Sequence, residues 1–245
     1  MFNLIKAELF KYSKKPFIYK LNIILVLCIM AVPFSLYLLN VDGVYREYII
    51  SGLGMSFNFI LILVMVFATV FLDDFREGTY KNIIVSNLSK RDIYLGKYIT
   101  QVILACTTMV ICTIAVIISL MFIKSNGTMD GIVRETVERF LYSIPMYFAG
   151  IALIDLLVII IKRGAVYIIY YLILTALPNI IGIAETVFWD KLKCIRVVLM
   201  SSILSNIQVA GATSKYLFIA VVSGIIYTTI FLVIGVTVFS TQEIK

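Results

Sequence analysis

Long apolar runs with almost no charge dominate the chain. Six of them reach the length of about 20 residues that a helix needs to cross a bilayer. They cover residues 21–41, 48–72, 98–123, 140–161, 164–184 and 216–240. These runs do not alternate between apolar and polar positions, as the strands of a transmembrane barrel would. The pattern therefore predicts an all-α integral membrane protein whose single transmembrane domain, residues 1–245, contains six transmembrane helices.

The first sixteen residues, MFNLIKAELFKYSKKP, have a different pattern. On a helical wheel Phe2, Ile5, Leu9 and Tyr12 share one face, and the lysines lie off that face. We expect an N-terminal amphipathic helix over residues 1–16 that lies in the membrane interface and ends at Pro16. The alternative is an ordinary basic flank that only sets the topology.

Residues 185–215 are too polar to cross a membrane twice and too apolar for free solvent. A segment of this length and composition favours short re-entrant or interfacial helices on the outer face, with Trp189 at headgroup level. The alternative is a folded outer loop without a role of its own.

Composition and charge agree with a membrane protein. The chain is 62% hydrophobic and 14% charged, and its mean hydropathy is +1.04. The net charge of +7 indicates contact with anionic lipid rather than nucleic acid. With the N-terminus inside, thirteen Lys and Arg lie on the cytoplasmic side and eight outside. This distribution predicts cytoplasmic N- and C-termini, although the four cations between the fifth and sixth runs oppose it.

Few residues could carry catalysis. Histidine is absent, so zinc motifs and Ser-His or Cys-His dyads are excluded. Asp155 is the one acid deep inside a predicted span, and no G-x-x-x-x-G-K-[ST] phosphate loop occurs. We therefore expect no enzyme activity, no metal site and no cofactor bound by this chain.

The most polar stretch, residues 73–97, reads DDFREGTYKNIIVSNLSKRDIYLGK. Gly78-Thr79 is expected to end the preceding helix and to cap a new one. The next ten residues predict a short helix with Ile83 and Ile84 on one side. An apolar pair inside such a polar loop indicates a helix that enters a groove on a partner protein. The alternative is a turn whose charges are simply solvated.

The same loop resembles that of bacterial type-2 ABC transporter permeases, through D-x-x-x-G-T-x-K-N from Asp74 and S-K-R-x-I-x-x-G-K from Ser89. The resemblance implies a cytoplasmic coupling helix between spans two and three that docks on an ABC ATPase. The residues it assigns to coupling are Asp74, Glu77, Gly78, Thr79, Tyr80, Lys81, Ile83, Ile84, Asn87, Lys90 and Arg91. The family often has a proline before the Ser-Lys pair, where this chain has Asn87-Leu88.

The resemblance also implies partners and a location. Two ATPase subunits would carry the ATP and magnesium, and two permease chains would pair, with a homodimer favoured over a heterodimer. The chain would lie in the bacterial cell (plasma) membrane.

Permeases of this size resemble those for lantibiotic self-protection and peptide-toxin export, so the expected substrate is an amphipathic or antimicrobial peptide. Lipids or hydrophobic drugs are the alternative substrates, and a non-transporting peptide-binding immunity or sensor protein is the alternative function. Spans two and five line the path in that family. The candidate path residues are Ser56, Asn58, Thr69, Asp155, Thr175 and Asn179. Asp155 has a second interpretation, in which it extends toward the Lys162-Arg163 pair.

Overall fold

The computed structural model describes residues 1–38, 58–78, 89–120, 129–187, 193–208 and 214–241. These residues are almost entirely helical and include no strand, as predicted for an all-α membrane protein. Five helices within these ranges are long and apolar enough to cross a membrane. They are Asn58–Glu77, Lys90–Ser119, Val133–Ile161, Ala165–Val187 and Ser214–Thr241.

The first predicted span corresponds to α2, Pro16–Leu38. Helix α2 has 23 residues, and its segment Pro16–Ala31 is apolar. The predicted runs 21–41 and 48–72 both extend into residues 39–57, which lie outside the described part of the chain. A count of six spans therefore stays a prediction.

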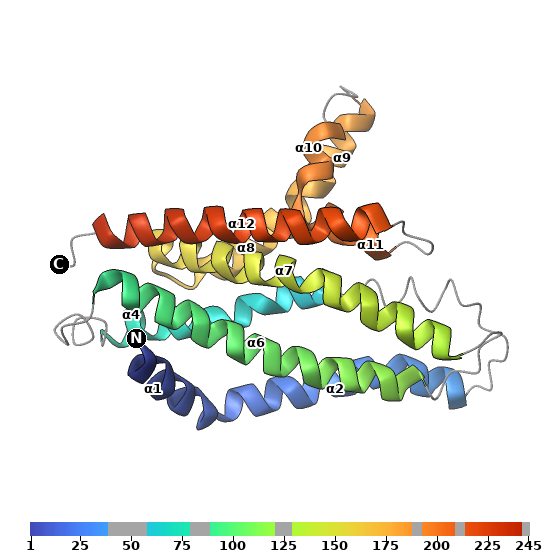
Figure 1. Ribbon diagram of the computed structural model, residues 1–245, viewed down its shortest axis with the longest axis horizontal. Coiled ribbons are helices and arrows are strands. Elements are labelled where there is room, and N and C mark those ends of the chain that lie inside the picture. Colours follow the sequence, from blue (N-terminus) through green and yellow to red (C-terminus); the bar gives the residue numbers. More distant parts are fainter. Residues whose placement is uncertain (39–57, 79–88, 121–128, 188–192, 209–213, 242–245) are drawn as a thin grey trace.

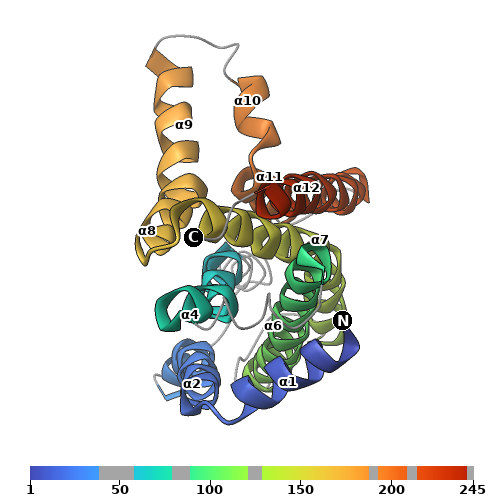
Figure 2. The same cartoon turned by 90° about the vertical axis from the view of Figure 1, so that its left-hand side faces the viewer.

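Helix α7, Met129–Ile161, lies at the centre of the bundle, between α6, Lys90–Leu120, and α12, Ser214–Thr241 (Figures 1 and 2). The contact between α7 and α12 is close at Gly224. A Cβ atom placed on Gly224 would lie 2.7 Å from the Pro145 carbonyl carbon. Small residues let transmembrane helices approach through their backbones, and Gly224 does so here.

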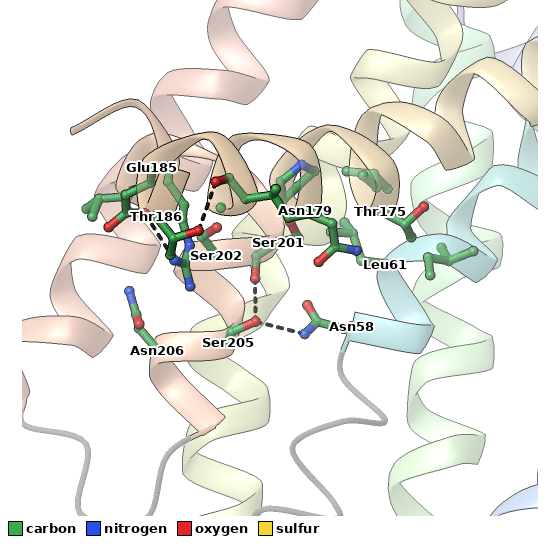
Figure 3. A pocket seen from close by; sticks show the side chains of 17 residues that line it. Asn58, Leu61, Thr175, Asn179, Glu185, Thr186, Ser201, Ser202, Ser205 and Asn206 are labelled. Atoms are coloured by element: carbon green, nitrogen blue, oxygen red, sulfur yellow. Dashed lines mark hydrogen bonds and ion pairs between the residues drawn. The ribbon is translucent and has the colours of Figure 1, made fainter. Parts of the chain in front are cut away.

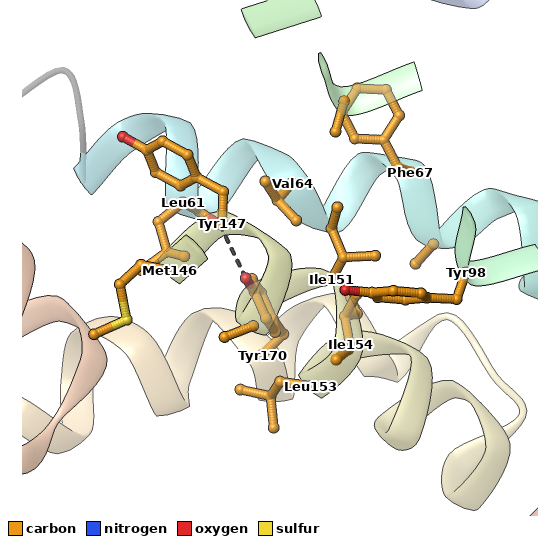
Figure 4. Packing of buried hydrophobic residues seen from close by; sticks show 14 of the residues in the cluster. Leu61, Val64, Phe67, Tyr98, Met146, Tyr147, Ile151, Leu153, Ile154 and Tyr170 are labelled. Carbon is orange, nitrogen blue, oxygen red and sulfur yellow. Dashed lines mark hydrogen bonds between the residues drawn. The ribbon is translucent and has the colours of Figure 1, made fainter. Parts of the chain in front are cut away.

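The second apolar helix packs its buried side on α7. It runs from Asn58 through η1, Val64–Ala68, to α4, Thr69–Glu77. Leu61 and Val64 approach Gly150 of α7, since a Cβ placed there would lie 2.9 Å from Leu61 Cδ1 and 3.8 Å from Val64 Cγ1. Figure 4 shows both residues in the buried cluster. Tyr170 of α8, Ala165–Tyr171, is buried there and donates a hydrogen bond of 2.9 Å to the Leu61 carbonyl. The bond satisfies a phenol that would otherwise be costly to bury.

The fifth apolar run changes course part of the way along. After α8 come the π-helix η2, Leu172–Ala176, and α9, Leu177–Val187. Figure 2 shows α9 leaving the bundle with α10, Lys193–Val198, beside it. No residue of α9 is buried. A π-turn inside a helix is often found at functional sites, and this one lies where the arm of α9 and α10 begins.

The segment expected to hold short helices, residues 185–215, contains α10 and α11, Met200–Gln208. Helix α11 lies against α12 and α7 (Figure 1). The position of these helices relative to a membrane stays a prediction, and Trp189 lies outside the described residues.

One end of the bundle gathers four elements that are far apart in the sequence. Helix α1, Phe2–Ser13, lies there with the end of α4, the start of α6 and the end of α12 (Figure 1). The Lys90 Nζ atom donates a hydrogen bond of 2.9 Å to the Ser240 carbonyl. We call this the loop end, because residues 79–88 connect α4 to α6 there. The shared end agrees with a topology in which both termini and the second loop lie on one side.

Candidate functional site

The flanks of loop 79–88 have defined helix caps. Helix α4 ends at Gly78, as predicted, and this residue has the left-handed conformation, with φ of 66°. On the other flank, the Ser89 hydroxyl accepts a hydrogen bond of 3.1 Å from the Asp92 backbone nitrogen. Ser89 Oγ also donates to Asp92 Oδ2 at 2.7 Å. These bonds give α6 an N-terminal cap, so the chain enters and leaves the loop at fixed points.

The structure describes only some of the predicted coupling residues. Glu77, Gly78 and Arg91 are exposed at the loop end, and Lys90 is partly buried. The others lie outside the described residues: Thr79, Tyr80, Lys81, Ile83, Ile84 and Asn87. The docking role of the loop therefore stays a prediction.

A buried ion cluster lies directly beneath these flanks. We call Glu8, Lys11, Asp74 and Lys97 the root cluster. Lys97 is fully buried, and its Nζ atom lies 2.9 Å from Glu8 Oε1 and also contacts Asp74 Oδ2. The second Asp74 oxygen pairs with Lys11 Nζ at 3.0 Å. Asp74 therefore directs its carboxylate into its own chain rather than outward to a partner.

A second set of contacts holds α1 on α4. The Tyr12 hydroxyl lies 2.9 Å from the Thr69 carbonyl and 3.1 Å from Asp73 Oδ2. Lys15 Nζ pairs with the same carboxylate at 2.5 Å. Burial and the Asp73 charge raise the pKa of Tyr12 well above its usual range, so its hydroxyl stays protonated and remains a donor.

The Lys11 ammonium is also stabilised in its charged form. Burial lowers the pKa of Lys11, but the hydrogen bond and charge of Asp74 outweigh that effect, and the pKa is raised. The root cluster therefore contains two ammonium groups and two carboxylates in contact. It joins α1, α4 and α6 to one another through these side chains.

The face that α1 presents to the bundle differs from the predicted apolar face. Ile5 and Tyr12 are buried as an apolar face requires, whereas Phe2 is 75% exposed. Glu8 is buried between Ile5 and Tyr12 on that face. The sequence does contain a signal that Glu8 faces the bundle. Glu8 is the only acid before Asp42, and its spacing places it on the same helical face as Ile5 and Tyr12.

Beyond the root cluster, about 24 Å along the helix from Asp74 to Asn58, the structure has a pocket of about 720 Å³. Figure 3 shows its walls, which come from the start of the second helix and from η2, α9, α10 and α11. Three predicted path residues, Asn58, Thr175 and Asn179, line it. Ser56 lies outside the described residues.

Small polar side chains face this pocket. Asn58 Nδ2 donates to Ser205 Oγ at 3.1 Å, which joins the second helix to α11. Glu185 of α9 pairs with Arg196 of α10 at 3.1 Å. Both links are drawn in Figure 3. They hold the arm and α11 around the pocket.

Two other predicted path residues do not line the pocket. The backbone of Thr69 faces Tyr12 at the loop end. Asp155 is fully buried and accepts a hydrogen bond of 2.7 Å from Gln101 Nε2. It pairs across helices α7 and α6, so the interpretation that it extends toward Lys162 and Arg163 is wrong. Its role in a path stays a prediction.

Arg139 is a further anchor that the sequence pattern did not single out. It is 3% exposed, and its Nη1 atom donates a hydrogen bond of 3.1 Å to the Ile207 carbonyl near the end of α11. It also pairs with Glu135, one helical turn away on α7. The available signal was an i, i+4 Glu–Arg pair at the edge of an apolar run.

The described residues combine charged and neutral polar side chains. Among them, no group of three His, Cys, Asp or Glu side chains is placed to hold a metal ion. Their polar groups form buried ion pairs at the loop end, and neutral polar side chains surround the pocket.

Comparison with known proteins identifies the family. Residues 4–182 match the model of the family described as ABC-2 family transporter protein. The match includes most of α1, the root cluster, loop 79–88 and part of the pocket wall. No curated protein matches the chain.

Proposed function

Because the chain belongs to the ABC-2 family of transporter proteins, we propose that it is the permease of an ATP-driven exporter of amphipathic peptides and that it associates with an ABC ATPase. In this proposal loop 79–88 docks on the ATPase, which carries the ATP and magnesium. Two permease chains, most simply identical ones, pair in a bacterial plasma membrane with the loop end in the cytoplasm.

The observation that supports a coupling role best is the root cluster. A docking loop can transmit force only if its flanks are tied to the helices that must move. Asp74 lies four residues before Gly78 and contacts Lys97 and Lys11. A push on the loop would therefore displace α4, α6 and α1 together.

The pocket supports a substrate that is both polar and apolar. Its walls combine hydroxyl and amide groups with Leu61, Ile62 and Leu174. Pockets of roughly 300–1,000 Å³ with apolar walls and a few polar groups are typical ligand sites. Lipids or hydrophobic drugs are the alternative substrates.

The docking proposal is tested by replacing each of the two loop isoleucines with aspartate. Burial of one Ile contributes roughly 1.5–3 kcal/mol, about a tenfold to hundredfold change in affinity. Ile83→Asp and Ile84→Asp should release the ATPase in a pull-down, or uncouple its hydrolysis from transport. Lys81→Ala is the control, because a charge at the rim sets orientation more than affinity.

Folding of each variant is checked by its yield and size-exclusion profile in detergent. Full ATPase binding and transport by both Ile→Asp variants would show that the loop is only a solvated turn. Normal ATPase coupling without stimulation by any peptide tested would retain the permease and remove the peptide substrate. A chain that binds peptide but never an ATPase would instead be a non-transporting binding protein.

A further inference from the structure

The pocket between the second helix and α9–α11 has a distinctive polar lining. Its hydroxyl and amide side chains come from four elements: Asn58, Thr175, Asn179, Thr186, Ser201, Ser202, Ser205 and Asn206. The Asn179 and Asn206 amides and the Ser202 hydroxyl can both donate and accept a hydrogen bond. The hydroxyls of Thr175, Thr186 and Ser205 already donate to backbone carbonyls and present acceptor lone pairs. The lining can therefore satisfy a ligand that presents donors and acceptors in alternation.

The pocket has no net charge among its described lining residues. Glu185 and Arg196 are the two ionisable groups in that lining, and they pair with each other at 3.1 Å. A charged ligand group entering there would lose its hydration without finding an unpaired counter-ion among Glu185 and Arg196. Burying a charge without such a partner is costly, so charged ligand groups are disfavoured.

Apolar side chains form the remainder of the wall, among them Leu174, Pro178 and Ile183. A ligand that fits must therefore bury apolar groups on one side and make neutral hydrogen bonds on the other. A peptide segment without charged residues has both properties, because its backbone amides donate and accept in turn.

We propose that this pocket binds an uncharged amphipathic segment of a peptide through the neutral amides and hydroxyls of α9, α11 and Asn58. This assignment rests on the proposed export function and specifies where the substrate is held. It also predicts selectivity: peptides with acidic residues in the bound segment and anionic phospholipids bind less well.

The test uses the full chain in lipid nanodiscs and photo-crosslinking. The probe is a short synthetic peptide of Leu, Ser, Asn and Gly that carries one photoreactive leucine. A matched peptide has two Ser replaced by Asp, and a third probe is photoreactive phosphatidylglycerol. Mapped cross-links of the neutral peptide should concentrate on α9 and α11, and the two anionic probes should label these helices less.

Two glycines provide an occluding variant and its control. A Cβ on Gly182 would lie 3.7 Å from Arg196 Nη1 and point into the pocket region, so Gly182→Phe should fill the space without a backbone clash. Gly164→Phe makes the same change where no atom lies within 4 Å of the new Cβ. Gly182→Phe should abolish labelling of α11, and Gly164→Phe should leave it intact.

Hydrogen-bond loss gives a graded readout. Ser202→Ala and Asn179→Leu each remove polar groups from the wall, and one lost bond weakens binding about 2- to 12-fold. Unchanged labelling in Gly182→Phe, or equal labelling of the pocket by the anionic probes, would overturn the assignment. So would failure of the neutral peptide to label α9 or α11.

Failure of the export function is scored separately. Binding of the ATPase to the same nanodiscs reports on the permease role and does not depend on the pocket. Selective pocket labelling without ATPase binding would retain the pocket assignment and remove the export proposal. ATPase binding without pocket labelling would retain the permease role and remove the pocket assignment.

Discussion

Lys97 occupies a position where a charged side chain is costly unless it is paired. It is fully buried near the loop end, and three oxygen atoms surround its ammonium: Glu8 Oε1, Asp74 Oδ2 and the Val70 carbonyl. The Phe71 ring lies 5.5 Å from the same nitrogen. Removing such a partner leaves buried carboxylates without compensation, and that loss is large.

We expect Lys97→Met to lower the free energy of unfolding by about 3–5 kcal/mol, because Glu8 and Asp74 lose their shared cation. Lys11→Met is the matched control. Its side chain is 35% exposed, so its ion pair contributes only about 0.2–1 kcal/mol. Denaturant unfolding of both variants in micelles measures the difference, and equal losses would contradict a central role for Lys97.

Variants of Asp155 test whether its hydrogen-bond acceptor or its carboxyl group as such contributes to stability. Asp155→Asn keeps an oxygen that accepts from Gln101 Nε2, so we expect stability within about 1 kcal/mol of the parent chain. Asp155→Leu leaves the Gln101 amide without that acceptor and should cost about 1–3 kcal/mol. The same unfolding measurement distinguishes them. Reduced transport by a normally assembled Asn variant would support the predicted path role.

At the scale of elements, the contact between α7 and α12 depends on the absence of a side chain. Gly224 faces the Pro145 carbonyl carbon and the Met146 nitrogen, both backbone atoms. Backbone cannot move aside as the end of a flexible side chain can. The two helices would therefore have to separate if position 224 carried a Cβ atom.

Gly224→Ala should destabilise the bundle by about 1–3 kcal/mol through overpacking. Gly164→Ala, where nothing lies within 4 Å of the added atom, is the control for the same chemical change. Thermal unfolding in one detergent compares them. A Gly224→Ala chain as stable as the control would show that α7 and α12 do not depend on this approach.

At the scale of the whole molecule, the shared loop end leads to a topology prediction. Cysteine labels at Lys81 and Lys162 should react from the cytoplasm, and labels at Lys124 and Lys191 from outside. Impermeant maleimide added to cells, and then to inverted vesicles, measures this. The reverse pattern would place the loop end outside and remove the ATPase docking proposal.

The helices could be predicted from the sequence because a bilayer demands them. Backbone groups in lipid must bond within their own segment, so a charge-free run such as residues 98–123 has one stable form. The predicted break at Gly78 follows from local chemistry and is observed. The Ser89 cap at the start of α6 obeys the same local rules.

The tertiary pairs could not be predicted in the same way. Lys97 was assigned to a basic loop, because the sequence does not show that its helix face turns toward Glu8 and Asp74. Arg139 and Ile207 are 68 residues apart, and no local rule pairs them. The pocket likewise depends on the course of α9 beyond the π-helix, whereas hydropathy alone predicts a straight span.

The Glu8–Lys97 pair has a consequence for biosynthesis. The two residues are 89 positions apart. A ribosome adding about 5–20 residues per second makes Glu8 roughly 4–18 s before Lys97. During that interval the N-terminal helix can form its contacts with Thr69, Asp73 and Asp74 but not the one with Lys97. The buried carboxylate of Glu8 thus stays without its cation until the start of α6 has been synthesised.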